Sequence, residues 1–580
     1  MANNDKKWSG MSKEKKRLVI NEEVDTFYKK AQEDAAIHEV VVSYDQEEPK
    51  SSSLEASSNN SINLGSYRSF ESIIDTSSEE IKNKSLLEEI RVWAIQYNVE
   101  NKALDDLLKI LITKHPELPK SCKTLLKCSS THLNISKMGS GEFVHFGLET
   151  ELIRYIESGL QSFRISSDRY NLLCAEATHF HSTLITLTFN IDGMPLFKSC
   201  SKSFWPILAK VNESTCLEPF IVSLYFGTNK PNDLNKYFSG IVENLNNLKY
   251  PIVVSGQRYL IRAFCIVSDA PARAFIKGIK YFNGYNGCEY CRQTGSYING
   301  KVVFDNHDAP ARTDQQFLNF QEKDHQKEMT AIGSIVPPVT CVPAEYMHLL
   351  CEGVFRKLLF LWVSSTCKYK GSFRIPPSNR VALSNKIVEN GKHMPKEFKH
   401  RKVRPLVEMD RWKATEFRTF FIYLAPLVMR SFLHPSVYAH TMLLHFAAFN
   451  MLGSDFLPIM DNISWCLKKF VTTFADHYGK GNLVYNIHCL LHLDEFVKNL
   501  GPLDFWSSFP FENKLRHIKK TINSNTNCLK QCINNVIRNS IFRTLSPSCN
   551  NLFYLSTHSP DNIYLTSSGM CYFVCYRCCV

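Results

Sequence analysis

Four runs rich in β-branched and aromatic residues lie between residues 180 and 270. They predict strands at Leu184–Ile191, Phe204–Val211, Pro219–Gly227 and Tyr259–Val267. Apolar residues recur at helical spacing in the stretches that follow the third and fourth strands, Asp233–Leu248 and Ala270–Ile279. The expected order is three strands, a helix, a strand and a helix. This order fits a mixed α/β sheet, in which an antiparallel meander is followed by a helical crossover to a parallel strand.

Helical spacing dominates the remaining apolar stretches. Two or three short helices are predicted between residues 85 and 128, where packing is favoured over DNA binding because the helices have no basic face. Longer helices are predicted at Phe355–Val363, Lys413–Phe432, Val437–Leu452, Asn462–His477 and Leu483–Leu500. The segment from residue 288 to 344 is irregular, and Lys368–Lys402 is predicted to be a basic, proline-containing loop or hairpin.

These patterns divide the chain into segments. Residues 1–84 are polar, with charged tracts and a Ser/Asn tract, and are predicted to be a disordered tail. The segments expected after it are a small helical segment at 85–135, the sheet core at 180–285, a Cys/His-containing insertion at 286–402, a helical region completing the core at 403–545, and a poorly structured cysteine-rich tail at 546–580.

Composition narrows the class of protein. The 580 residues are 44% hydrophobic and 21% charged, which suits a soluble globular protein. The net charge of +12 favours a polyanionic partner such as nucleic acid, with a generic basic protein as the alternative. Twenty cysteines are scattered through apolar segments behind a polar N-terminus, so a reducing nucleus or cytosol is expected. No apolar stretch is long enough to predict a transmembrane helix.

Two aspartates stand at the exits of predicted strands, Asp192 after the first and Asp269 after the fourth. If these strands are neighbours, the two carboxylates can hold a pair of Mg²⁺ or Mn²⁺ ions for phosphodiester chemistry. The alternative is that Asp192-Gly193 and Asp269-Ala-Pro are strand-ending turns. The order of elements between the two aspartates favours the metal-binding interpretation.

A third acid is expected from a later helix. Glu416 falls in the first turns of an amphipathic helix, next to Lys413 and Arg418, which could instead make it a surface ion-pair partner. Glu352 and Glu512 are the competing candidates.

A C-x₂-C pair, Cys288 and Cys291, follows a Gly-Tyr-Asn-Gly turn and supplies half of a structural zinc site. The candidates for the completing ligands are His348, His325 and His307. In a chain with this many cysteines a chance pair is the alternative. The helical pair His488 and His492 has no adjoining glutamate of the metalloprotease kind, and is predicted to be packed or polar.

Several motifs in this order resemble the CACTA (En/Spm-like) group of DDE/D transposases over about residues 85–540. They are the runs beginning at Phe189, Ser203, Asp269, Gly287, Glu345 and Phe509. The resemblance implies a ribonuclease H-like core with a zinc-associated insertion and a helical remainder. It implies that Asp192 and Asp269 are the first two catalytic acids, that the third is Glu416, and that Cys288, Cys291 and His348 are the C-x₂-C and Met-His elements.

The resemblance further implies a transposase or transposon-derived protein that cuts and joins DNA by metal-dependent hydrolysis and strand transfer. DNA is then the expected partner, together with further copies of the chain, and the nucleus is the expected compartment. The alternative is a catalytically inactive descendant that binds DNA or protein, because no complete DNA-recognition module is recognisable in the sequence.

Overall fold

A computed structural model describes most of the chain. The described residues are 85–97, 99–126, 134–161, 165–197, 201–214, 218–364, 373–394, 402–522, 524–545, 563–565 and 571–573. They fall into two compact units, a large one that includes residues within 132–532 and a small one that includes residues within 22–131 and 533–550. The predicted tail at 1–84 and nearly all of the predicted tail at 546–580 lie outside the described residues.

The large unit is built on a mixed sheet of eight strands. They are β1 Ser136–Met138, β2 Gly141–His145, β3 Thr183–Ile191, β4 Met194–Pro195, β5 Ser203–Val211, β6 Phe220–Gly227, β7 Ile252–Val254 and β8 Gln257–Val267. Their order across the sheet is β1-β2-β6-β5-β3-β8-β7, and β4 pairs with β5 beside this path. Only the β3–β8 pair is parallel among these strands. The chain therefore makes a meander and then crosses over, as the sequence predicts.

The central strands are buried on both faces. Every residue of β6 is buried, as are all residues but the first of β3 and of β5, which is expected of strands covered by other elements on both sides. The covering helices of this part are α7 Glu149–Glu157, α8 Asp168–His179, α9 Leu234–Asn247 and α10 Ala270–Ile276. All four predicted strands and both predicted helices are present. The outer strands β1 and β7 and the strand β2 beside β1 were not predicted, because each is short and carries little periodicity.

The chain after α10 is mainly helical. Its elements are β9 Ser296–Ile298, β10 Lys301–Val303, α11 Asp314–Leu318, η1 Ala331–Ser334, η2 Met347–Phe355, α12 Arg356–Val363, α13 Pro377–Lys392, η4 Leu406–Arg411, α14 Ala414–Thr419, η5 Phe420–Leu424, α15 Ala425–Met429, α16 Pro435–Leu452, η6 Leu457–Ile459, α17 Met460–Tyr478, η7 Lys480–Asn482, α18 Tyr485–Cys489, η8 Leu490–His492, α19 Leu493–Leu500, α20 Phe509–Lys520, α21 Cys528–Leu545, β11 Ile563–Leu565 and β12 Cys571–Phe573.

Helix α13 corrects the prediction of a loop or hairpin at Lys368–Lys402. Its buried face is narrow, with Leu383 and Ile387 one turn apart. The proline that argued against a helix, Pro377, stands at its first turn, where the missing N–H removes no helical hydrogen bond.

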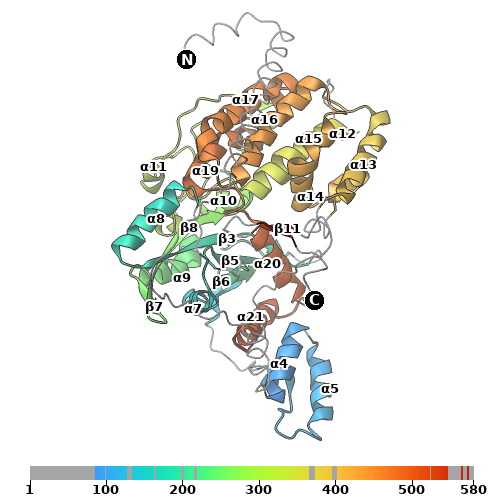
Figure 1. Cartoon of the computed structure of the whole chain (residues 1–580). Helices are drawn as coiled ribbons and strands as arrows, with labels where there is room; N and C mark the ends of the chain where they lie inside the picture. The colour runs from blue at the N-terminus through green and yellow to red at the C-terminus, as the bar shows by residue number, and fades with distance from the viewer. Residues whose placement is uncertain are drawn as a thin grey trace, which may run out of the picture. The chain divides into compact units, whose positions relative to one another are not determined.

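Helix α20 brings the end of the large unit back to the sheet. Lys514 pairs with Glu218 just before β6, at 2.6 Å, and Lys519 Nζ donates to the carbonyl oxygen of Pro195 in β4 at 2.5 Å. Figure 1 shows the helices α12 to α19, yellow to orange, on one side of the sheet. The large unit contains the ends of β3 and β8 together with η2 and α20. The candidate site is formed by residues of these elements.

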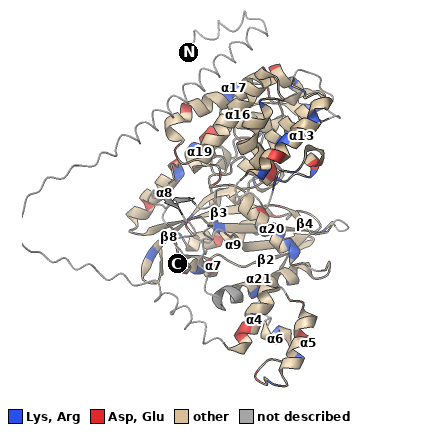
Figure 2. Cartoon of the chain, turned by 45° about the vertical axis from the view of Figure 1, so that its right-hand side comes forward, with Lys and Arg blue, Asp and Glu red and all other residues tan. Residues whose placement is uncertain are grey.

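The small unit contains α4 Leu86–Gln96, α5 Asn101–Leu111 and α6 Cys122–Leu125. Its helices share an apolar core that includes Ile90, Leu104 and Leu108. Lys and Arg residues are spread over the sheet and the helices, interspersed with Asp and Glu, in Figure 2. Within the described part of the chain, no helix combines the length and the hydrophobicity that a bilayer span requires.

Candidate functional site

Asp192 and Asp269 follow two adjacent parallel strands at the same end of the sheet. Asn190 of β3 lies opposite Val267 of β8, and its side-chain amide donates to the Val267 carbonyl oxygen at 2.9 Å. Each aspartate comes two residues later. The two strands are thus adjacent and parallel, which is the arrangement that the metal-binding interpretation requires.

Local structure fixes both carboxylates. Asp269 caps α10, because its Oδ1 accepts a hydrogen bond from the N–H of Ala272 at 2.7 Å. Asp192 accepts a hydrogen bond from the N–H of Gly193 at 2.7 Å. A side chain at Gly193 would lie 2.6 Å from the Trp205 ring, so the residue after Asp192 has to be small. Both aspartates are therefore turn or cap residues and candidate metal ligands at once.

The pKa of Asp192 is shifted by burial and by the charged groups around it. Burial, together with the nearby charges of Asp269 and Glu512, raises the pKa of Asp192 to about 7. The charge of His348 acts in the opposite direction. A carboxyl with such a pKa, beside other acids, is typical of a site that needs a cation to balance its charge.

His348 is held as a cation by acids on its own and neighbouring elements. Its Nδ1 donates to Glu345 Oε2 at 2.8 Å. Burial lowers the pKa of His348, but the hydrogen bond and charge of Glu345, with the charges of Asp269 and Asp192, raise it to about 9. The imidazole thus belongs to the acidic site.

Glu345 is fully buried and joins η2 to α20. Its carboxylate accepts from the backbone N–H of Met347 at 2.8 Å, of His348 at 3.1 Å and of Ser508 at 2.8 Å. Ser508 is the residue before α20, whose first turn carries Glu512. Glu345 therefore sets His348 and Glu512 in position relative to each other.

A pocket of about 510 Å³ opens beside these side chains. His348, Glu512 and Arg516 line it together with Lys413 and Arg418, so acids and basic residues share its wall. Burial raises the pKa of Glu512, and the charge of His348 opposes this.

Glu416 is engaged by a different set of partners. It is 3% exposed, and its carboxylate accepts two hydrogen bonds of 2.8 Å from Arg404 and one of 2.9 Å from the N–H of Lys413. Burial raises its pKa, but these donors outweigh burial and hold the pKa below the usual range. Glu416 is thus an ion-pair partner, as the alternative held, but its partner is the side chain of Arg404 and not that of Lys413 or Arg418.

Lys230 is a neighbour of the two aspartates that the sequence did not single out. Its ammonium lies 5.0 Å from the centre of the Trp205 ring and 4.9 Å from that of Phe275, a residue of α10. Burial lowers the pKa of Lys230, while the charges of Asp269 and Asp192 raise it. A lysine in a loop has no periodic signal, so only the fold reveals this placement.

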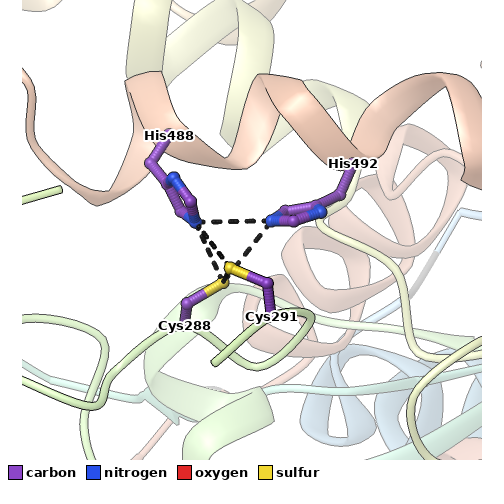
Figure 3. A group of neighbouring side chains, drawn as sticks. All are labelled: Cys288, Cys291, His488 and His492. Carbon is purple, nitrogen blue, oxygen red and sulfur yellow. Dashed lines mark hydrogen bonds between the residues drawn. The ribbon is translucent and has the colours of Figure 1, made fainter. Parts of the chain in front are cut away.

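Four potential metal ligands gather about the C-x₂-C pair: Cys288, Cys291, His488 and His492. The cysteines lie on the loop after α10, and the histidines come from α18 and η8, four residues apart on one helical face. Figure 3 shows both imidazole rings directed from this helical segment toward the two sulfur atoms. The Cys288 thiol, by its hydrogen bond, lowers the pKa of Cys291, which favours the thiolate that binds metal.

The distances between these atoms fit a tetrahedral zinc ion. The two sulfurs are 3.6 Å apart, the two Nε2 atoms 3.3 Å, and the sulfur–nitrogen distances 3.2, 3.2 and 3.6 Å. Zinc bonds of about 2.3 Å to sulfur and about 2.0 Å to nitrogen give tetrahedron edges of about 3.8 Å, 3.3 Å and 3.5 Å for these three kinds of pair. The group can therefore hold a metal such as zinc without rearrangement.

This ligand group corrects the prediction for the histidines. His348 is engaged by Glu345, and His325 uses its Nδ1 on the carbonyl oxygen of Asn286 at 2.8 Å. The ligands that the structure brings to the cysteines are instead His488 and His492, which were predicted to be packed helix positions. Their spacing of four was the available signal, but some two hundred residues separate them from the cysteines.

No protein-family model and no curated protein matches the chain. Among solved structures the chain is similar to the Drosophila P element transposase strand transfer complex, with 12% sequence identity and a TM-score of 0.38. The match covers 82% of this chain and 99% of that chain. Similarity this remote carries no argument, so the interpretation rests on the site itself.

Proposed function

We propose that this protein is a ribonuclease H-like, metal-dependent DNA-processing protein of the transposase kind, or a descendant of one. The observation that carries the proposal is the placement of Asp192 and Asp269 at the ends of two adjacent parallel strands, with Glu512 close enough to act on the charge of Asp192. The motif string that resembles the CACTA group supports the same class.

In this proposal Asp192, Asp269 and Glu512 hold two Mg²⁺ or Mn²⁺ ions. Such ions activate a water or a 3′-hydroxyl and stabilise the leaving oxygen in phosphodiester hydrolysis and strand transfer. The chain itself supplies hard oxygen ligands, which these cations prefer. The third acid in this proposal is Glu512 and not Glu416, the residue predicted from the sequence, because the Glu416 carboxylate is already engaged by Arg404.

The residues around the acids suit a DNA substrate. Lys230 offers a cation beside the aspartates, and Arg418 and Arg516 line the adjoining pocket. Phosphate oxygens are the groups that such side chains contact in DNA complexes. The Cys288/Cys291/His488/His492 group, in contrast, would supply four protein ligands and leave no open position, so a metal bound there would have a structural role.

The test is cleavage of a duplex DNA by the purified full-length chain with Mn²⁺, comparing the wild type with Asp192→Asn and Asp269→Asn. Activity in the wild type that is lost in both variants supports the proposal. Metal binding at the aspartates without cleavage would identify an inactive descendant. Failure of the wild type to bind Mn²⁺ through these residues would refute the site.

A further inference from the structure

One buried side chain connects the two candidate metal sites. Glu289 lies between Cys288 and Cys291 in the sequence and is 2% exposed. Its Oε1 accepts hydrogen bonds from Arg273 Nε at 2.8 Å and from the Tyr485 hydroxyl at 2.7 Å. Its Oε2 accepts from Lys277 Nζ at 2.9 Å. The C-x₂-C loop thus carries a buried carboxylate whose three partners are not members of the Cys288/Cys291/His488/His492 group.

The two cations bound by Glu289 belong to the helix that positions Asp269. Arg273 is in α10 and Lys277 is its C-cap residue, whereas Asp269 is its N-cap residue. Arg273 also donates through Nη1 to the carbonyl oxygen of Ser268 at 2.9 Å. It therefore holds the backbone immediately before Asp269, at the end of β8.

The hydroxyl in this network comes from α18, the helix that supplies His488. Tyr485 opens α18, and His488 follows one turn later. The Tyr485 hydroxyl accepts a hydrogen bond from Arg273 Nη2 at 3.0 Å while it donates to Glu289. Both segments that supply metal ligands are in this way hydrogen-bonded to Arg273.

Burial makes the network a rigid link. The side chains of Arg273, Lys277 and Glu289 are at most 3% exposed, so no water can replace a lost partner at low cost. The buried cations Arg273 and Lys277 both pair with the Glu289 carboxylate, which balances their charge. The position of this carboxylate depends in turn on the conformation of the C-x₂-C loop, which a bound metal would fix.

We propose that Glu289 is a positioning residue through which the Cys288/Cys291/His488/His492 metal sets the location of Asp269, and so the affinity of the acidic site for Mg²⁺ or Mn²⁺. This inference rests on the proposed function, since it takes Asp269 as a ligand of the catalytic ions. Zinc then acts on the acidic site without touching its ligands.

The experiment measures three quantities in the full-length protein: zinc content, Mn²⁺ affinity by electron paramagnetic resonance, and stability in urea. Glu289→Gln keeps all four zinc ligands. We expect it to retain one zinc per chain and to bind Mn²⁺ about tenfold to a hundredfold more weakly, the range typical for loss of a residue that orients a metal ligand.

The matched control is Glu322→Gln. Glu322 is 6% exposed and pairs with Arg292 and Arg312, and Arg312 donates to the carbonyl oxygen of Cys288. It is thus a buried, doubly paired acid next to the same loop, but its pairs do not reach α10. We expect Glu322→Gln to lose stability and keep the Mn²⁺ affinity.

A milder variant covers the case in which Glu289→Gln does not fold. Tyr485→Phe removes only the hydroxyl, and we expect zinc to remain and Mn²⁺ to bind less tightly than in the wild type. Wild-type Mn²⁺ affinity in Glu289→Gln or Tyr485→Phe, or an equal loss in Glu322→Gln, would overturn the coupling. If Asp269→Asn leaves Mn²⁺ binding intact, the proposed function fails as well, and the two failures are thereby distinguished.

Discussion

The carboxylate of Glu345 accepts a hydrogen bond from the backbone N–H of Ser508, 2.8 Å away and 163 residues later in the chain. The same carboxylate holds the His348 imidazole. A buried acid just before η2 thus fixes the start of α20, and α20 carries Glu512 toward the aspartates. The relation explains how a helix far along the chain completes the acidic site.

Replacement of Glu345 by Gln should release His348. Because the hydrogen bond and charge of Glu345 are the main influences that raise the pKa of His348 to about 9, the variant should titrate well below that value. Loss of one partner of a buried pair should cost about 3–5 kcal/mol of unfolding free energy. NMR titration of His348 and urea unfolding measure the two effects. The control is Glu352→Gln, a substitution at an exposed position of η2. An unchanged His348 pKa in Glu345→Gln would contradict the pairing of Glu345 with His348.

Substitutions of Glu512 and Glu416 should show which of the two is the third acid of the site. Glu512→Gln should abolish Mn²⁺-dependent DNA cleavage and leave folding intact, because Glu512 is only half-buried. Glu416→Gln should keep cleavage and lose about 1–3 kcal/mol of stability, because it weakens a buried, charged hydrogen-bond group. Cleavage assays and urea unfolding of both variants decide between them, and the opposite pattern would return the role to Glu416.

The difference between these two glutamates shows what local pattern can and cannot reveal. The strands that end before Asp192 and Asp269 are long, apolar and separated by a periodic helix, so their order predicts that they are neighbours. Glu416 and Glu512 both stand in the first turns of helices with aromatic residues, and local sequence does not distinguish them. The distinction comes from Arg404 and Glu345, whose partners are set by tertiary packing.

The Cys288/Cys291/His488/His492 group also shows what local sequence can and cannot predict. Cys288 and Cys291 are recognisable because their spacing of three is local, and so is the turn before them. A side chain at Gly287 would come within 2.7 Å of the carbonyl oxygens of Tyr281 and Phe282, which explains why glycine precedes the pair. His488 and His492 have only helical spacing to mark them. Which histidines meet the cysteines depends on how α18 packs after a long helical excursion.

Removal of a zinc ligand should identify the true histidines. His488→Ala and His492→Ala should each lower the zinc content below one per chain and reduce the unfolding temperature, because structural zinc contributes directly to folding free energy. His325→Ala should keep its zinc, since His325 is bonded to Asn286 instead. Metal analysis of the purified proteins with thermal unfolding checks this. Zinc lost from His325→Ala but kept in His488→Ala would refute the ligand set.

Lys230 should contribute to DNA binding without contributing sequence preference. If its ammonium contacts a phosphate, Lys230→Ala should weaken binding uniformly across sequences and reduce the slope of log affinity against log salt by about 1. Fluorescence anisotropy at several salt concentrations measures the slope. Lys236→Ala is the control, because the Lys236 ammonium donates to the carbonyl oxygen of Lys137. An unchanged slope in Lys230→Ala would remove this lysine from the DNA contact.

Glu213 should make the stability of the sheet depend on pH. It is 5% exposed and accepts two 2.7 Å hydrogen bonds from Thr186, one from the backbone and one from the hydroxyl. Burial outweighs these bonds and raises the pKa of Glu213 from 4.5 to about 7. Between these two pH values the folded protein holds a proton that the unfolded chain has released.

The sign of the effect follows from this difference. Stability from Glu213 is fully present below pH 4.5, falls as the pH rises toward 7, and is constant above it, with a total loss on the order of 3 kcal/mol. Glu213→Gln has no proton to release, so its unfolding free energy should fall less over this range than that of the wild type. Urea unfolding at intervals from pH 4.5 to 8 gives the difference between the two proteins. Parallel pH profiles would show that Glu213 is ionised in the folded state throughout the range.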